Sequence, residues 1–163
     1  GDARDVGTLQ WVVGAVAVTT ILISGRISDR IGQIRALGLA AVLIAAGLLV
    51  YDAVAEIGPM DRFASILYGL GWGLYFAFKL AVLARITTPE SRFRVYALLS
   101  VAVMLGFGLW PVWGAAVPRA TGSVSAAFLL SAALCVLGGL IYQVLRGPIQ
   151  SLSGPVAKTD ALT

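Results

Sequence analysis

The stretch Phe63–Ala84, FASILYGLGWGLYFAFKLAVLA, decides the fold class of this chain. It carries a single charged residue, Lys79, in an otherwise uncharged and mostly apolar run. A hydrocarbon core about 30 Å thick is spanned by roughly 20 residues of helix. A backbone in lipid must also satisfy its own hydrogen bonds, which a helix does and an isolated strand does not. The stretch is therefore predicted to be a membrane-spanning helix.

Four further runs of the same kind flank this one. Thr8–Gly25 and Ala36–Tyr51 precede it, the latter extending towards Ala55, and Val95–Val117 and Ser123–Leu145 follow it. Of the 163 residues, 59% are hydrophobic and 12% are charged, whereas about 25% are charged in a typical soluble domain. The alternating pattern of β-barrel strands is absent. We therefore expect an all-α membrane protein.

The predicted domain organisation is one helical bundle and one tail. Residues 146–163 are mostly polar and contain the breakers Gly147-Pro148 and Gly154-Pro155, which predict a flexible cytoplasmic tail or linker. Residues 1–145 are expected to form a bundle of five transmembrane helices, at about 8–25, 36–55, 63–84, 95–117 and 123–145.

The basic residues between the runs predict the orientation in the membrane, because loops rich in Lys and Arg remain in the cytoplasm. The segments after the first, third and fifth runs hold Arg26, Arg30, Arg35, Arg85, Arg92, Arg94, Arg146 and Lys158. The other segments hold only Arg4, Arg62 and Arg119, beside the acids Asp2, Asp5, Asp52, Glu56 and Asp61. We expect the N-terminus outside and the C-terminus inside, in a bacterial cytoplasmic (inner) membrane. This topology accounts for the formal charge of +4, so no nucleic acid is expected as a partner.

An external N-terminus is difficult to produce without a signal peptide, and no basic segment precedes the first run. The simplest arrangement has one more helix upstream. We therefore expect a fragment, about one six-helix half of a carrier that lacks its first helix, with a natural truncation as the alternative. Which half it represents is left open, although a tail that stops at Thr163 favours the C-terminal half.

The most specific local pattern is Gly25–Arg35, GRISDRIGQIR, in the ten-residue turn expected between the first two runs. A positively charged cytoplasmic loop accounts for its arginines but not for the aspartate among them. The pattern resembles the signature loop of the major facilitator superfamily, Gly-x-x-x-Asp-Arg-x-Gly followed by basic residues. The matching positions are Gly25, Asp29, Arg30 and Gly32, whereas Gln33 and Ile34 depart from the usual Arg or Lys and Arg35 partly restores the charge.

The resemblance implies a fold and a role for this loop. The fold would be a helical bundle that carries a small solute by alternating access, and the loop would be a conformational switch that steadies the outward-facing state. Glycines permit a tight turn and close helix approach. Asp29 could face a helix N-terminus or an arginine and form a latch whose strength depends on conformation. The resemblance implies this role for Asp29 and Arg30.

Two further patterns resemble the same superfamily. Pro89, Glu90 and Arg92 in the loop after the third run are similar to the family's Pro-x-Glu-x-Arg loop. The fourth run contains Gly106–Gly114, GFGLWPVWG, which resembles the glycine–proline motif of proton-driven antiporters, with Trp110 where Gly usually precedes Pro. A proline kink with small-residue packing is the alternative for this helix-packing motif. Its candidate residues are Gly106, Gly108, Pro111 and Gly114.

The third run offers the candidate substrate cavity. Amphipathic aromatic side chains and a cation on one stripe suggest a water-filled cavity, in which Lys79 could contact an anionic group. Alternatively Lys79 snorkels, since Arg85 lies six residues on, roughly 9 Å of helix rise. Gly69, Gly71 and Gly73 are expected to serve close packing rather than phosphate binding. The stripe is formed by Tyr68, Trp72, Tyr75 and Lys79, which lie on one helical face at i, i+4, i+7 and i+11.

These patterns lead to three classes of function. The first is a secondary active transporter, with a proton-coupled antiporter as one possible mode. A proton-coupled carrier normally needs an acidic group in the membrane, and no Asp or Glu lies inside any of the five runs. The second is a transport-inactive scaffold or assembly subunit of a larger membrane complex. An enzyme is not expected, because the chain has no His and no paired buried carboxylates. The expected partners are the lipid bilayer, a small-molecule solute, and either the remaining helices of the carrier or a partner subunit, and no cofactor or metal is implied.

Overall fold

The computed structural model describes residues 3–54, 59–145 and 147. Within these ranges the chain is helical, without a strand, which confirms the predicted all-α class. Of the predicted tail, residues 146 and 148–163 lie outside the described residues, as does Glu56. The helices are α1 (Ala3–Ile31), α2 (Gln33–Ala53), α3 (Pro59–Ile86), α4 (Pro89–Thr121) and α5 (Val124–Val144).

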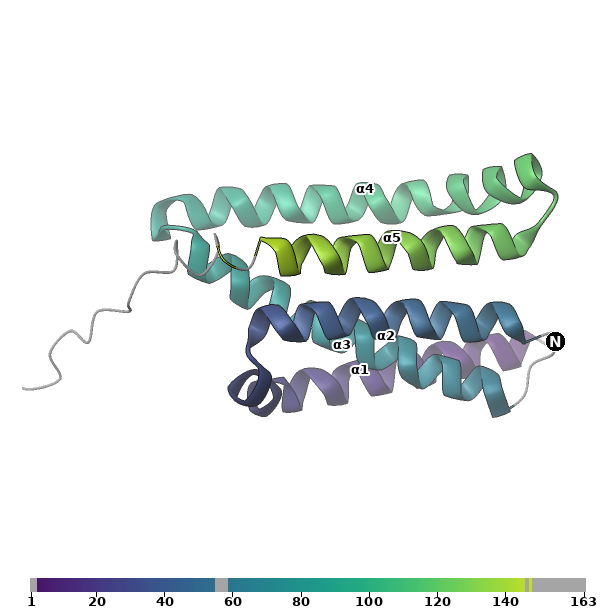
Figure 1. The fold of residues 1–163 in the computed structure, drawn as a ribbon, viewed down its shortest axis with the longest axis horizontal. Coiled ribbons are helices and arrows are strands. Elements are labelled where there is room, and N and C mark those ends of the chain that lie inside the picture. Colours follow the sequence, from purple (N-terminus) through teal and green to yellow (C-terminus); the bar gives the residue numbers. More distant parts are fainter. Residues whose placement is uncertain (1–2, 55–58, 146, 148–163) are drawn as a thin grey trace, which may run out of the picture.

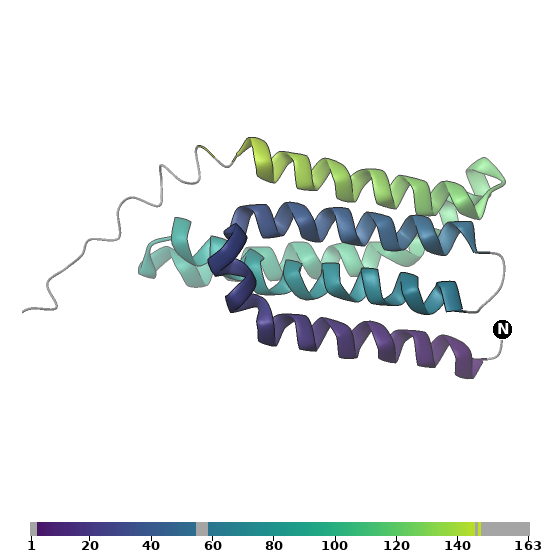
Figure 2. The same cartoon turned by 60° about the horizontal axis from the view of Figure 1, so that its bottom comes forward.

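The five helices run up and down, with each antiparallel to the next in the chain (Figure 1). The α1–α2 and α3–α4 connections and the end of α5 lie at one end of the bundle, and the end of α2, the start of α3 and the α4–α5 connection lie at the opposite end. α3 packs against both α1 and α2, α5 packs against α2, and α4 contacts chiefly α5. Figure 2 shows α5 on the opposite side of the bundle from α1, with α2 and α3 between them. The two groups of loops that the charge count separated are therefore at opposite ends.

Four of the helices are long and apolar enough to cross a membrane, and α4 makes a fifth if its two bent parts form one span. The parts Pro89–Gly106 and Pro111–Thr121 meet at an angle of 41°. Pro111 lies inside α4, and a proline removes a helical hydrogen bond and clashes with the carbonyl four residues earlier. The bend has this local cause, and the number of predicted spans agrees with the five helices.

The connection between α1 and α2 differs from the ten-residue turn predicted for residues 25–35. α1 is helical to Ile31 and α2 begins at Gln33, so the reversal rests on Gly32, whose φ of 79° lies in the left-handed region. The helix continues because Ile27 and Ile31 pack against the buried cluster that includes Leu37. A loop would leave these side chains exposed. Gly32 is the residue that the turn requires, since other residues rarely adopt positive φ.

The centre of the bundle depends on glycines of α3 that admit neighbouring backbones. A Cβ added at Gly73 would lie 2.6 Å from the carbonyl oxygen of Ala17 on α1, and one at Gly69 would lie 2.8 Å from that of Val13. Gly71 faces the opposite neighbour, where a Cβ would lie 2.8 Å from a carbonyl oxygen of α2. The three glycines thus bring α3 into backbone contact with both α1 and α2. Their predicted role in close packing is confirmed.

Candidate functional site

The aromatic stripe of α3 is continuous in the structure. The ring centroids of Tyr68 and Trp72 lie 6.0 Å apart, and those of Trp72 and Tyr75 lie 5.7 Å apart, both in edge-to-face arrangements. The ammonium nitrogen of Lys79 lies 4.8 Å from the centroid of Tyr75. The helical repeat of 3.6 residues brings these four side chains together, as their spacing indicated.

Phe76 belongs to the same group and was missed in the sequence. Its ring stacks on that of Trp72, with centroids 5.2 Å apart and an angle of 28° between the planes. The Nζ of Lys79 lies 4.1 Å from its centroid, compared with 4.8 Å from the centroid of Tyr75. The signal was present, because Phe76 stands four residues after Trp72 and three before Lys79. Phe76 is 37% exposed, so its ring forms part of an accessible surface.

The side chain of Lys79 bears on the two interpretations that the sequence left open. Its ammonium lies over Tyr75 and Phe76, the residues one turn earlier in α3. It is therefore folded towards the N-terminal half of the helix and away from Arg85, which lies in the last turn. A snorkelling lysine would extend towards that last turn and the headgroups. The cation–π contacts group Lys79 with the aromatic stripe, and its role in a substrate cavity remains a prediction.

One edge of the stripe is packed and the other is not. Tyr68, Trp72 and Tyr75 pack against a buried cluster from α2 and α5 that includes Leu48 and Ala132. Because their inner edges are held there, these rings have fixed positions. Phe76 and Lys79 lie at the outer edge of the group, at which the rings are less covered. The group can therefore offer an ordered surface to a small molecule.

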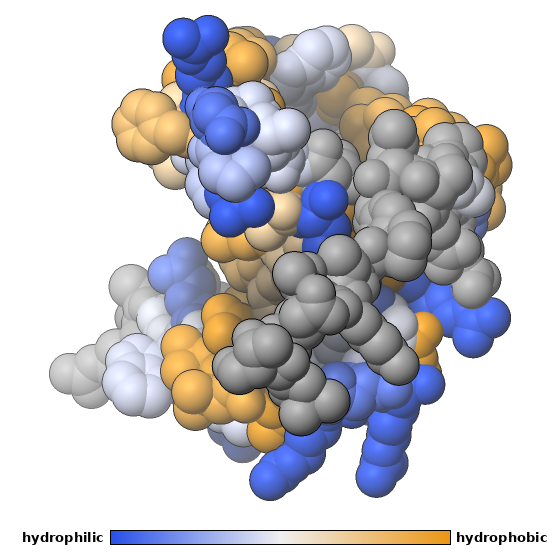
Figure 3. All heavy atoms as spheres, turned by 90° about the vertical axis from the view of Figure 1, so that its left-hand side faces the viewer, coloured by the Kyte–Doolittle hydropathy of each residue, from blue (hydrophilic) through white to orange (hydrophobic). Residues whose placement is uncertain are grey.

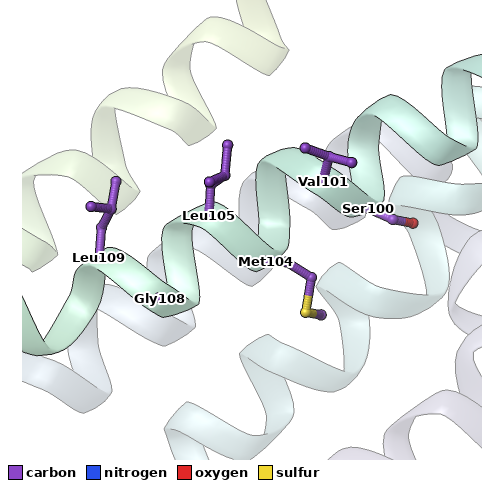
Figure 4. Close-up of a pocket in the computed structure, with 6 residues that line it drawn as sticks. All are labelled: Ser100, Val101, Met104, Leu105, Gly108 and Leu109. Atoms are coloured by element: carbon purple, nitrogen blue, oxygen red, sulfur yellow. The ribbon is translucent and has the colours of Figure 1, made fainter.

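Helix α4 joins α3 only near the end where the two helices connect. The hydroxyl of Tyr96 donates to the carbonyl oxygen of Leu80 at 3.4 Å, and Arg92 donates from Nη2 to that of Ala84 at 3.1 Å. Figure 3 looks onto this end, where hydrophilic side chains lie around the rim and the molecule is hollowed between its upper and lower parts. An apolar hollow of about 440 Å³ follows α4 beyond these contacts (Figure 4). Its lining residues are Ser100, Val101, Met104, Leu105, Gly108 and Leu109.

The residues of the predicted switch loop lie at the same end of the bundle. Asp29, Arg30 and Arg35 are exposed, and within the described residues their side chains form no ion pair. A Cβ at Gly25 would meet nothing within 4 Å, so this glycine lies on an open face of α1 rather than in a turn. Gly32 alone supplies the reversal. The latch between Asp29 and an arginine therefore remains a prediction.

The loop before α4 is a helix cap. The hydroxyl of Thr88 accepts a hydrogen bond from the backbone N–H of Ser91, Pro89 stands at the first helical position and Glu90 lies in the first turn. Arg92 reaches back to α3, and its Nε is buried without a hydrogen-bond partner in the described part of the chain. The arrangement ties the start of α4 to the last turn of α3. Whether Pro89, Glu90 and Arg92 have the role that the resemblance implies remains a prediction.

The glycine–proline motif of α4 has a different environment from the glycines of α3. A Cβ at Gly106, Gly108 or Gly114 would meet nothing within 4 Å. Pro111 lies at the bend of the helix. Pro111 thus accounts for the bend of α4. Packing of the three glycines against a neighbouring helix remains a prediction.

Asp61 is a second residue whose position the sequence did not indicate. It was assigned to a connecting segment, but it lies in the first turn of α3 and is only 6% exposed. Its carbonyl oxygen accepts a hydrogen bond from the hydroxyl of Ser65, which also shares a hydrogen bond of 2.6 Å with the hydroxyl of Tyr51. Asp61 is thus a buried carboxylate at the end of the bundle opposite the arginine-rich loops. No three potential metal-ligating side chains cluster within residues 3–54, 59–145 and 147.

Comparison with known proteins identifies the family. The sequence model of the family described as Major Facilitator Superfamily matches residues 2–161, which is nearly the whole chain, so the chain belongs to this family. No curated protein and no solved structure was found to match it. The chain is accordingly an integral membrane protein of a transporter family, and such proteins are generally not enzymes.

Proposed function

We propose that this member of the major facilitator superfamily is part of a secondary active transporter that moves a small solute across the membrane by alternating access. The observation that carries the proposal is the position of Lys79. Its ammonium lies over two aromatic rings in an apolar helix and has no carboxylate partner within the described residues. An ionisable side chain inside a membrane helix is costly and is usually retained for function.

The solute would contact α3 on the aromatic stripe. Trp72 and Tyr75 are held by their packing against α2 and α5, while Phe76 and Lys79 are accessible from the outer edge. The remaining walls would come from other helices of the same carrier or from a partner subunit. Carrier sites of this kind lie near the bilayer midplane, between two bundles that rock against each other.

We also propose a proton-coupled antiporter mode, with the carrier in a bacterial inner membrane, its N-terminus outside and its C-terminus in the cytoplasm. The larger number of basic residues in the segments at one end of the bundle supports the orientation. Asp61 is the buried acidic side chain of the described residues, so it is the carboxylate on which we place the coupling proton.

The test is a flux assay with the full-length gene product reconstituted in liposomes. Uptake that depends on an imposed pH gradient and that falls in the variants Asp29→Ala and Lys79→Ala supports the carrier. Asp61→Asn should abolish the response to the gradient while solute exchange at equal pH continues, since a protonatable group is lost and the binding stripe is intact. Arg62→Gln, an exposed neighbour, is the control. A full-length chain that moves no solute, yet copurifies with a fixed partner, would support the scaffold instead.

A further inference from the structure

We propose that the solute is a planar aromatic anion, such as an aromatic carboxylate, whose charge binds Lys79 and whose ring stacks beside Trp72 and Phe76. This inference rests on the proposed transport function and adds the chemical class of the substrate. Lys79, Trp72 and Phe76 form one group of side chains with Tyr75. The inference follows from the charge, the shape and the exposure of this group.

The charge of the group is positive and unneutralised. Within the described residues, Lys79 is the only charged side chain between Arg62 and Arg85 on α3, and it forms no ion pair there. The faces of two aromatic rings partly satisfy the ammonium in the absence of solute. An anion would form a stronger, charge-assisted hydrogen bond with it, at about 2.8 Å. A cationic solute would be repelled, because like charges disfavour each other in a site of low dielectric.

The shape of the group favours a flat body attached to that anion. Trp72 and Phe76 present nearly parallel rings, 28° apart in orientation, whereas Tyr75 meets both of them edge-on. The Nζ of Lys79 lies 4.1 Å from the Phe76 centroid. A carboxylate that contacts this ammonium therefore brings its attached ring alongside the Phe76 ring. Offset stacking contributes beyond the burial of apolar area, which an aliphatic chain cannot match.

The exposure of the group allows the solute to reach it. Phe76 is 37% exposed, and Leu80, the next exposed residue on the helix, accepts the hydrogen bond from Tyr96 at the junction with α4. At this junction α4 contributes the hydroxyl of Tyr96 and the guanidinium of Arg92, whereas the hollow farther along α4 is lined by apolar residues and Ser100. Lys79 is the cation of the stripe, and it binds the charged group of the solute.

An anionic lipid headgroup would satisfy the same charge, so the test must separate the two sources. Full-length protein is placed in nanodiscs of phosphatidylcholine, and binding of tritiated 2-naphthoate is measured at equilibrium. Three matched competitors are 2-naphthamide, which is neutral, 2-naphthylmethylammonium, which is a cation, and octanoate, which is an aliphatic anion. A second set of nanodiscs contains phosphatidylglycerol.

We expect 2-naphthoate to bind to the wild-type protein. The neutral and cationic competitors should bind at least about tenfold more weakly, since one charge-assisted hydrogen bond corresponds to a change of that order. Octanoate keeps the charge but has no ring to stack, so it should bind several-fold more weakly. Lys79→Gln should weaken binding by about tenfold or more, and Lys79→Arg should retain most of it. Arg85→Gln removes the same charge from an exposed position of α3 and should have no effect. Phe76→Leu should weaken binding several-fold, whereas Phe63→Leu, an exposed aromatic of the same helix, should not.

The inference is overturned if 2-naphthoate does not bind, if the cation or octanoate binds as tightly, or if Lys79→Gln binds like the wild type. It is also overturned if phosphatidylglycerol displaces 2-naphthoate completely, because the lipid is then the ligand. Binding without flux in liposomes would leave the aromatic-anion site standing and refute the transport function. Flux of another solute without 2-naphthoate binding would refute the aromatic-anion site and leave the transport function standing.

Discussion

Replacing Gly73 by alanine should separate α1 from α3. The added Cβ would lie 2.6 Å from the carbonyl oxygen of Ala17 and 2.6 Å from the Cβ of Thr20. Contacts between carbon atoms are most favourable at about 3.5–4.0 Å, so the two helices must move apart by about 1 Å at this point. The carbonyl belongs to the backbone of α1 and cannot rotate away as a flexible side chain could.

The expected magnitude is a difference between two opposing effects. Overpacking in a close-packed interior costs about 1–3 kcal/mol, whereas replacing glycine by alanine in a helix stabilises it by about 0.5–1 kcal/mol. The variant Gly73→Ala should therefore lose about 1–2 kcal/mol of unfolding free energy. This loss lowers the ratio of folded to unfolded protein about five- to thirtyfold.

The assay is reversible unfolding in mixed micelles, with sodium dodecyl sulfate as denaturant and tryptophan fluorescence as the signal. Gly14→Ala is the matched control, because it makes the same change in α1 at a position where a Cβ meets nothing within 4 Å. The control should be as stable as the wild type or more stable. If Gly73→Ala proves as stable as Gly14→Ala, the close contact between α1 and α3 is refuted.

Three further predictions concern the ends and the bend of the helices. Gln143→Leu removes the hydrogen bond of 3.1 Å from Nε2 to the carbonyl oxygen of Ile34, so it should cost about 0.5–1 kcal/mol in the same unfolding assay; an unchanged midpoint would show that α5 is not tied to α2 there. Thr88→Ala removes the cap of α4, which is worth about 1 kcal/mol, and should speed amide exchange at Ser91 and Arg92 about fivefold, with rates in α5 as the internal control. Pro111→Ala should straighten the 41° bend, lengthening the distance between spin labels at positions 98 and 120 by about 2 Å for a helix that rises 1.5 Å per residue; an unchanged distance, measured with Cys135 replaced by serine, would assign the bend to another cause.

The candidate site was only partly readable from the sequence. The spacing of Tyr68, Trp72, Tyr75 and Lys79 placed them on one face, because helical periodicity is a local property. Phe76 was missed because the stripe at i, i+4, i+7 and i+11 takes Tyr75, three residues after Trp72, and passes over Phe76, four residues after it. The direction of Lys79 was not readable, since a long side chain can extend to either side and its contacts with rings decide the outcome.

The sequence by itself determined the class, the number of helices and the family of this protein. Apolar runs such as Phe63–Ala84 specify spanning helices because hydrophobicity and helix length add up residue by residue along the chain. The alternation of arginine-rich and arginine-poor segments likewise depends only on the order of residues. Such properties need no knowledge of which helices are neighbours.

Only the tertiary structure decided which face of each helix packs. Gly73 and Gly106 are both glycines with apolar neighbours in the sequence. Gly73 admits the backbone of α1, whereas a Cβ added at Gly106 would meet nothing within 4 Å. A helix in lipid is apolar on every side, so periodicity does not distinguish the packed face from the lipid face. For the same reason the continuation of α1 to Ile31 and the burial of Asp61 depend on contacts with other helices, which the order of residues does not contain.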